Sequence, residues 1–341
     1  MNNTVLFHRN SIYKDNNFIK VGKFKGNNLF MGIDKLSFIS YIDNQFERNN
    51  TYHKLDFLSR EKSKEYKIEK IKDKHYKRCI KITSINNPDF YLVISYIFSH
   101  KQDNGGIRIE LSPQYDNTQI SSIYNIVEWL KDSIGDDTVK NLLKNSKITR
   151  IDIAVDIYSN QFISNYYFSI PKSRTGVRFN NNKDSCKNNY AIGNNRSELY
   201  LLVYEKAKLI KESNIGSKEL ISVKEKDIVN RITRLELRIK PKKELLLSSI
   251  SELKNPFSKI NIYSKRAIQS RFCDFLPFLE KERSLPIAIN SFLDCVGSSS
   301  RYMRYQVNKT LENCKSKHIL DIDWQKWQDI VRILSPINTL S

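Results

Sequence analysis

Apolar and polar side chains alternate along several short segments before residue 245. The segment LFMGIDKLSFISYI at 29–42 is the first of them, and its period of two is typical of a half-buried β-strand. The same alternation, rich in β-branched and aromatic residues, predicts further strands at 79–85, 90–100, 106–113, 148–159, 197–206 and 232–240.

Helical spacing replaces this alternation in two regions. From Thr118 onward, apolar residues recur every three or four positions through Ile134, and a second amphipathic stretch begins at Val139. The charged stretch at 45–78 predicts a surface helix or loop, and beyond Lys240 the segments at 245–254, 262–282, 300–315 and 323–334 are helical in pattern. The expected fold class is α+β. A mainly antiparallel sheet domain with flanking helices occupies 30–245, between an N-terminal extension at 1–29 and a helical C-terminal region at 246–341.

The charge balance adds a class of partner. The chain has 57 Lys and Arg residues against 37 Asp and Glu residues, a net charge of +20, while 40% of its residues are hydrophobic. So many apolar side chains can build a core, which excludes a disordered basic tail. A large positive excess favours a polyanion such as nucleic acid, although a coding bias toward Lys, Asn and Ile would produce the same excess.

Two further observations concern compartment and redox chemistry. The first residues lack the apolar segment of a signal peptide, and the apolar run Tyr91 to Phe98 is too short to span a bilayer, so we expect a cytoplasmic protein without a membrane partner. The cysteines are odd in number and show no CxxC spacing. They are expected to be free thiols, with neither a disulfide framework nor a structural zinc site.

Three predicted strands repeat a short pattern of arginine, apolar residue and acid. Because side chains alternate across a strand, each strand should place its charged residues on one face and its apolar residues on the other. The charged sets are Arg108 with Glu110, Arg150 with Asp152 and Asp156, and Arg234 with Glu236 and Arg238. If these strands are neighbours, the acids converge and need either arginine or a divalent cation to neutralise them. The alternative to a functional site is that arginines and acids simply form ion pairs across a solvated face of the sheet.

A fourth strand adds a tyrosine to this arrangement. In SELYLLVYEK, Tyr200, Leu202, Tyr204 and Lys206 share one face. A phenol has a pKa near 10, so a tyrosine nucleophile needs a nearby base or cation, and Lys206 or a bound metal would provide the positive charge. A purely structural tyrosine is the alternative, with its ring in the core and its hydroxyl at the surface.

The order of these motifs resembles the replication initiation factor family, of the Rep-trans type, found in rolling-circle plasmids and filamentous phages. The resemblance covers about residues 30 to 245 and rests on DKLSF at 34–38, RIELSP at 108–113, WLK at 129–131, TRIDIAVD at 149–156, GNNRSELYLLVYEK at 193–206 and ITRLELRIK at 232–240. It implies a domain that nicks one DNA strand at a replication origin and later rejoins it through a 5′-phosphotyrosine.

Site residues follow from the resemblance position by position. It implies that Tyr204 is the nucleophile and Lys206 its catalytic neighbour. It implies further that Glu110, Asp152 and Glu236 hold Mg²⁺ or Mn²⁺, while Asp156 matches a family acid of less certain role. The implied partners are origin DNA, single-stranded or in a hairpin at the nick, a second copy in a homodimer, and a host helicase.

The chain departs from the family pattern near the tyrosine. Leu202 stands where the family often has arginine, and Arg196 lies one place later than the family's phosphate-binding arginine. Tyr200 lies four residues before Tyr204, a spacing used by some initiators with two tyrosines, and the adjacent pair Tyr166 and Tyr167 is a more distant candidate nucleophile.

We expect DNA binding from two groups of arginines. Arg150, Arg196 and Arg234 would contact DNA at the sheet. In the helical C-terminal region, basic side chains on two predicted helices would read bases or track phosphates, namely Arg266, Arg271, Arg301 and Arg304. A solvated basic face is the alternative for these helices. A mobilisation relaxase with the same chemistry and a non-enzymatic DNA-binding initiator are the alternative functions.

Overall fold

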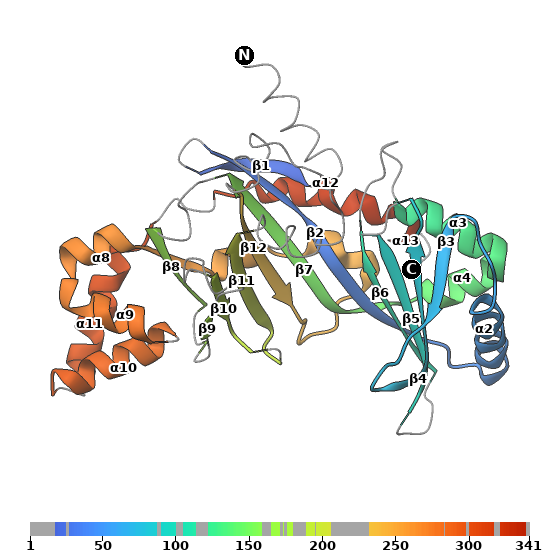
Figure 1. The fold of residues 1–341 in the computed structure, drawn as a ribbon, viewed down its shortest axis with the longest axis horizontal. Coiled ribbons are helices and arrows are strands. Elements are labelled where there is room, and N and C mark those ends of the chain that lie inside the picture. The colour runs from blue at the N-terminus through green and yellow to red at the C-terminus, as the bar shows by residue number, and fades with distance from the viewer. Residues whose placement is uncertain are drawn as a thin grey trace, which may run out of the picture.

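The structure is a computed structural model. It describes residues 18–24, 27–86, 90–99, 105–113, 122–158, 165–170, 173, 176–179, 189–194, 196–205, 232–282, 284–297, 300–316 and 321–338. The predicted α+β class is confirmed, because a large antiparallel sheet is flanked by helices and the C-terminal region is mostly helical (Figure 1).

An eleven-stranded antiparallel sheet forms the centre of the molecule. Its strands are β1 (Ile19–Phe24), β2 (Asn27–Tyr41), β3 (Tyr66–Lys70), β4 (Tyr76–Ser84), β5 (Tyr91–Phe98), β6 (Gly106–Ser112), β7 (Lys147–Tyr158), β9 (Gly176–Phe179), β10 (Asn189–Ile192), β11 (Leu199–Glu205) and β12 (Ile232–Ile239). The spatial order is β3-β4-β5-β6-β2-β7-β12-β11-β10-β9, with β1 paired to β2. Strand pairing therefore begins before residue 30, inside the segment assigned to the N-terminal extension.

The apolar face of this sheet is covered by helices. These are α2 (Gln45–Leu58), α3 (Ser122–Ile134), α4 (Asp136–Leu143), α12 (Trp327–Val331) and α13 (Ser335–Asn338). Ile151, Ile153 and Leu235, which the alternation predicted to point away from the charged residues, are fully buried in this core. Among the described residues, no helix combines the length and the apolar character needed to cross a bilayer.

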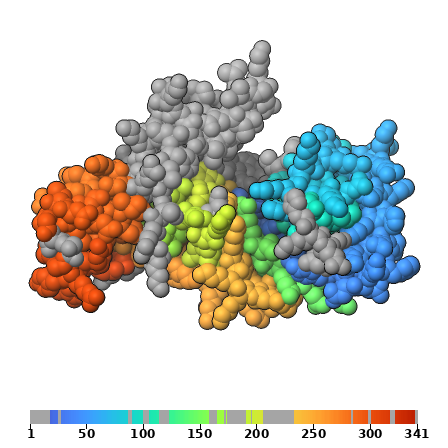
Figure 2. Space-filling model, turned by 90° about the horizontal axis from the view of Figure 1, so that it is seen from below, coloured from blue at the N-terminus to red at the C-terminus, as the bar shows by residue number. Residues whose placement is uncertain are grey.

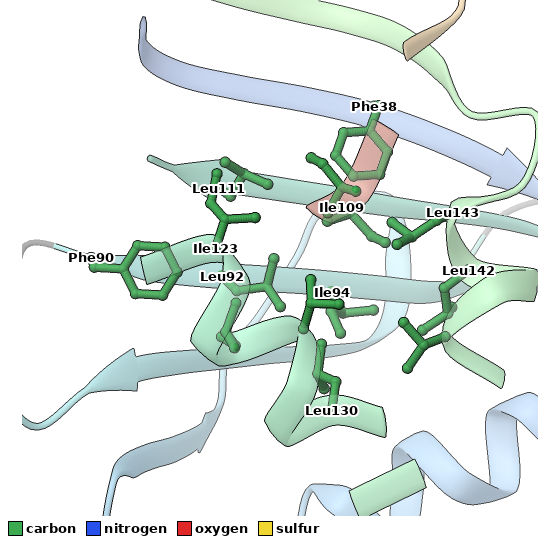
Figure 3. A pocket seen from close by; sticks show the side chains of 14 residues that line it. Phe38, Phe90, Leu92, Ile94, Ile109, Leu111, Ile123, Leu130, Leu142 and Leu143 are labelled. Atoms are coloured by element: carbon green, nitrogen blue, oxygen red, sulfur yellow. The ribbon is translucent and has the colours of Figure 1, made fainter. Parts of the chain in front are cut away.

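A small apolar cavity lies within this core, between β5, β6 and the helices α3 and α4 (Figure 3). Its volume is about 30 Å³, and its lining includes Phe38, Ile94, Ile109 and Leu130. The lining is entirely hydrophobic, so the space offers a water molecule no hydrogen-bond partner. We interpret it as a packing gap, because it offers no polar group to a ligand.

Two segments differ in element type from the sequence expectation. The stretch 45–78 contains the expected helix α2 but also β3, which pairs with β4 at the sheet edge. The segment 262–282 begins with a strand, β13 (Asn261–Ser264), which pairs with β8 (Tyr166–Ser169) in a separate two-stranded sheet. The local pattern of these two short segments is compatible with either a helix or a strand. In both cases, hydrogen bonding to a partner strand makes the segment a strand.

The C-terminal region contributes to two separate cores. The short 3₁₀ segment η1 (Leu247–Glu252) and α12 pack on the large sheet, where Trp327 donates its indole N–H to the carbonyl of Ile250 at 2.9 Å. Four helices between them form a separate core with β13 and Tyr167, and we call them the helical cluster: α8 (Lys265–Arg271), α9 (Leu276–Lys281), α10 (Leu285–Cys295) and α11 (Arg301–Asn313). The cluster forms a lobe at one end of the molecule (Figures 1 and 2).

Candidate active site

The register of four adjacent strands collects the predicted charged residues on one face of the sheet. Tyr204 on β11 lies opposite Arg234 on β12, which lies opposite Asp156 on β7. Directly opposite residues share a face, so these side chains form a row across the sheet. A second row contains Tyr200, Arg238, Asp152 and Lys35, and Glu236 projects between the two rows.

The first row contains a buried ion pair. Arg234 donates from Nε to Oδ1 of Asp156 at 2.7 Å and from Nη2 to Oδ2 at 2.9 Å, and Nη1 contacts Asp34 at 2.9 Å. Asp156 is fully buried and Arg234 nearly so. Burial alone would lower the pKa of Arg234, but its two acidic partners outweigh burial and raise the pKa. This guanidinium is therefore permanently charged and held in place.

Three predicted metal ligands surround a second guanidinium. Arg150 bonds Asp152 through Nε at 2.8 Å and through Nη2, and its pKa is raised because these bonds and the nearby Glu110 and Glu236 outweigh burial. Asp152 also contacts Arg238, Nε to Oδ1 at 3.4 Å. Glu110, Asp152 and Glu236 thus lie around a basic side chain of the protein.

These carboxylates do not form a metal centre in the arrangement described. Within the described ranges, no group of three or more His, Cys, Asp or Glu side chains is placed to hold a metal ion. Glu110 is bound by Lys35 at 2.5 Å, and Asp152 is bound by two arginines. Because basic side chains already neutralise two of the predicted ligands, the residues as placed do not fit a shared Mg²⁺ or Mn²⁺ ion.

Tyr204 contacts Glu236, an acid that lies near the guanidinium groups of Arg150 and Arg234. Its hydroxyl donates to Oε2 of Glu236 at 3.2 Å, and among the described residues no lysine or arginine forms an ion pair with that carboxylate. Burial, followed by the charges of Asp34 and Asp152, raises the pKa of Glu236 to about 7. Burial also raises the pKa of Tyr204 above its usual range, although Arg234 acts in the opposite direction.

Asp34 belongs to this site and was not assigned a role from the sequence. It lies on β2 where the register with β7 shifts between Ile33 and Lys35, and a bulge of this kind turns an extra side chain toward one face. The signal in the sequence was the pair of adjacent polar residues Asp34 and Lys35, which interrupts the alternation of the strand. Asp34 joins Arg234 and adds negative charge near Glu236.

The other tyrosine candidates lie elsewhere or point to a different partner. Tyr166 and Tyr167 on β8 are each only 4% exposed; Tyr166 packs in the core of the large sheet, and Tyr167 packs in the core of the helical cluster. Tyr200 shares the charged face, where the guanidinium of Arg238 lies 5.2 Å from its ring centre. Of the tyrosines considered, Tyr204 is the one whose hydroxyl bonds Glu236.

The remaining predicted residues are not at the charged face or are not described. Lys206 lies outside the described residues. Arg196 is exposed in the turn before β11, where its backbone N–H donates to Oδ1 of Asn194 at 2.6 Å. The four predicted arginines of the C-terminal region are all exposed on α8 and α11 of the helical cluster, which both DNA binding and a solvated basic face would require: Arg266, Arg271, Arg301 and Arg304.

Comparisons with known proteins returned a structural likeness only. No protein-family model matches the chain, and no curated protein matches it. Among solved structures, the chain is similar to the rolling circle replication initiator protein from Geobacillus stearothermophilus, over 78% of this chain and 96% of that chain. The identity is 13% and the TM-score is 0.33, a level that does not establish a shared function.

Proposed function

We propose that this protein is a rolling-circle replication initiator that nicks one DNA strand at its origin through a 5′-phosphotyrosine on Tyr204 and later rejoins the strand. The observation that carries the proposal is the contact between the Tyr204 hydroxyl and the carboxylate of Glu236 beside Arg234, on a sheet face crowded with charge. The motif resemblance described above supports the same reading.

Glu236 is suited to act as the general base for Tyr204. A base has to lie within hydrogen-bond reach of the proton it removes and works best with a pKa near the working pH. The Glu236 carboxyl meets both conditions, with a 3.2 Å contact and a pKa of about 7. This role differs from the metal-ligand role that the resemblance implies for the same residue.

The proposed step conserves the energy of the phosphodiester bond. Glu236 accepts the proton of the Tyr204 hydroxyl as Oη bonds the scissile phosphorus, the bond from phosphorus to O3′ breaks, and O3′ takes a proton from solvent. The products are a 5′-phosphotyrosine and a free 3′-hydroxyl that can prime synthesis. Attack by that hydroxyl on the phosphotyrosine reverses the step and rejoins the strand without ATP.

We propose that two arginines bound to Asp152, Arg238 of the second row and Arg150 two residues before Asp152 on β7, bind the scissile phosphate. Side chains of Arg150 and Arg238 are 22% and 18% exposed, so each retains a surface that an incoming phosphate can reach. Both are anchored by Asp152, which orients them before DNA arrives. Fixed positive charge of this kind stabilises the negative charge that develops on the phosphate oxygens during transfer.

Metal dependence and protein partners are separate proposals. A requirement for Mg²⁺ or Mn²⁺ stays a prediction from the resemblance, because the acids as placed do not fit a shared ion, and no step above passes through a metal. The homodimer and the host helicase likewise stay predictions. A mobilisation relaxase would use the same chemistry at a transfer origin, and the cognate DNA site distinguishes it from a replication initiator.

A non-enzymatic DNA-binding initiator is the second candidate function. It is favoured by the raised pKa of Tyr204 and by the pairing of Asp152 and Asp156 with arginines, since both features fit a structural network. In that case the charged face would serve stability alone, and the chain would bind origin DNA without cleaving it.

A nicking assay separates these candidates. The wild-type protein is incubated with a supercoiled plasmid carrying the DNA that flanks its own gene, with and without Mn²⁺. The proposal expects relaxed, nicked plasmid and a covalent protein–DNA adduct, which Tyr204→Phe abolishes and the matched control Tyr200→Phe retains. An adduct that persists in Tyr204→Phe moves the nucleophile elsewhere, and plasmid that is bound but never cut supports the non-enzymatic candidate.

A further inference from the structure

The helical cluster exposes an aromatic and basic face that its folding does not use. Helix α11 buries Val307 and Leu311 on one side, against the core of the cluster. On its other side, Tyr302 is 67% exposed and Tyr305 is 59% exposed. Residues three apart on a helix are neighbours on its surface, so these two rings present adjacent planes to solvent.

The helix that carries the two rings is also basic. From residue 301 to residue 309, α11 carries three cations, Arg301, Arg304 and Lys309, and no acid. All three are exposed. Arginines in the first turn oppose the helix dipole, so their placement does not stabilise the helix. Glu312, an exposed acid farther along α11, is paired with Lys315 at 2.5 Å, so the part of the face around the rings keeps the positive charge of a surface that meets a polyanion.

Two contacts give this face a defined shape. Arg304 donates from Nη2 to Oδ1 of Asn290 on α10 at 2.8 Å, which fixes its guanidinium against the neighbouring helix. At the far end, Arg271 of α8 donates from Nη1 to the backbone carbonyl of Asn313 at 2.8 Å. The second contact joins the basic end of α8 to the end of α11, so the positive surface continues onto a second helix.

We propose that the exposed face of α11 binds single-stranded DNA, with Tyr302 and Tyr305 stacking on unpaired bases and Arg301, Arg304 and Lys309 holding the backbone. Interleaved aromatic and basic side chains are the combination that binds single strands, because every base has a face for stacking and every phosphate carries a charge. In a duplex the faces of the bases are covered by their neighbours, so exposed rings have much less to bind.

This inference rests on the proposed function, because the strand that Tyr204 attacks has to reach the sheet unpaired. It adds a role to the helical cluster beyond the predicted reading of origin bases by arginines. The cluster lies beside the β9 end of the sheet (Figure 1), and from there it would hold a melted strand near the strands that carry Tyr204 and Glu236.

Fluorescence anisotropy with short labelled oligonucleotides tests the inference directly. The full-length protein is titrated against a single-stranded oligonucleotide, the matching duplex, and a single strand of the same length made of abasic sites. The double variant Tyr302→Ala/Tyr305→Ala should bind the single strand at least about tenfold more weakly, while its duplex affinity changes less than twofold. The wild type should show a similar loss on the abasic strand.

Two control proteins show whether stacking is the cause. Tyr302→Phe/Tyr305→Phe keeps both rings and should retain the affinity of the wild type. Tyr124→Ala removes a half-exposed ring from α3, at the opposite end of the sheet, and should leave binding unchanged. Circular dichroism melting of each variant confirms that it is folded, which is expected because the substituted rings are largely exposed.

Several outcomes would overturn the inference. Equal losses on single strand and duplex would assign the face to the DNA backbone, and an unchanged affinity would remove it from DNA binding. A shift from dimer to monomer in sedimentation velocity, with DNA binding intact, would assign the rings to self-association. Failure of nicking leaves this test untouched, since the binding assay needs no cleavage, so failure of one proposal is distinguishable from failure of the other.

Discussion

Replacing Glu236 with glutamine should stabilise the folded protein at neutral and alkaline pH. The Glu236 side chain is nearly buried, and the carboxylates of Asp34 and Asp152 lie near it, so its ionised form is disfavoured and its pKa rises to about 7. Glutamine has almost the same shape, carries no charge, and can still accept the hydrogen bond from Tyr204. The variant therefore removes the charge and keeps the packing.

The expected magnitude follows from the two pKa values. A rise from the ordinary 4.5 to about 7 corresponds to roughly 3 kcal/mol of unfavourable free energy for the ionised carboxylate. Between these values the folded protein binds more protons than the unfolded chain, so wild-type stability falls as pH rises. Relative to the wild type, Glu236→Gln should gain about 1 kcal/mol at pH 5 and about 3 kcal/mol at pH 8.

Urea denaturation at pH 5, 6, 7 and 8, followed by circular dichroism, measures this difference. Glu110→Gln is the matched control, because Glu110 lies on the same face but is partly exposed and paired with Lys35. Its loss should cost at most about 1 kcal/mol, with little change across this range. Parallel stability curves for the wild type and Glu236→Gln from pH 5 to pH 8 would refute the raised pKa, and with it the assignment of Glu236 as a base suited to neutral pH.

Three further predictions concern the arginines and the metal. Arg234→Gln should destabilise the protein by about 3–5 kcal/mol in urea denaturation, because it leaves the buried Asp156 unpaired, whereas Lys140→Gln, from an exposed pair, should cost less than about 1 kcal/mol. If nicking requires a divalent cation, EDTA and Asp152→Asn should each reduce the nicking rate by orders of magnitude. Calorimetry should then show that Asp152→Asn binds Mn²⁺ more weakly than the wild type. Full nicking activity in EDTA would contradict the requirement for a metal. At least one of four alanine substitutions should lower affinity for the origin by about 1–3 kcal/mol while sparing random duplex, and equal losses on both DNAs would contradict base reading. The four residues are Arg266, Arg271, Arg301 and Arg304.

The alternation along each strand was enough to predict which side chains would enter the apolar core and which would share the charged face. Ile153 and Leu237 are fully buried while Asp152 and Arg238 meet on the opposite face, as a period of two requires. The fold class could be predicted for the same reason. The spacing of apolar residues in a helix or a strand is a local property of the sequence, so it can be recognised without knowing which strands pair.

The pairing of strands could not be read from local periodicity. The structure places β2 between β6 and β7, so Lys35 lies between the strands that carry Glu110 and Asp152 and binds the first of them. The bulge at Asp34 and its contact with Arg234, 200 positions away in the chain, depend on register across the sheet. Contacts between residues so far apart are decided by the packing of the whole chain.

The partners of the predicted metal ligands were likewise decided by the packing of the whole chain. The sequence showed that acids and arginines would share one face, and it left open whether arginine or a divalent cation would neutralise the acids. Only the tertiary structure placed the guanidinium of Arg150 among Glu110, Asp152 and Glu236, and left Glu236 to the hydroxyl of Tyr204. Charge type is a property of each residue, but the partner of each charge is set by the distances that the fold creates.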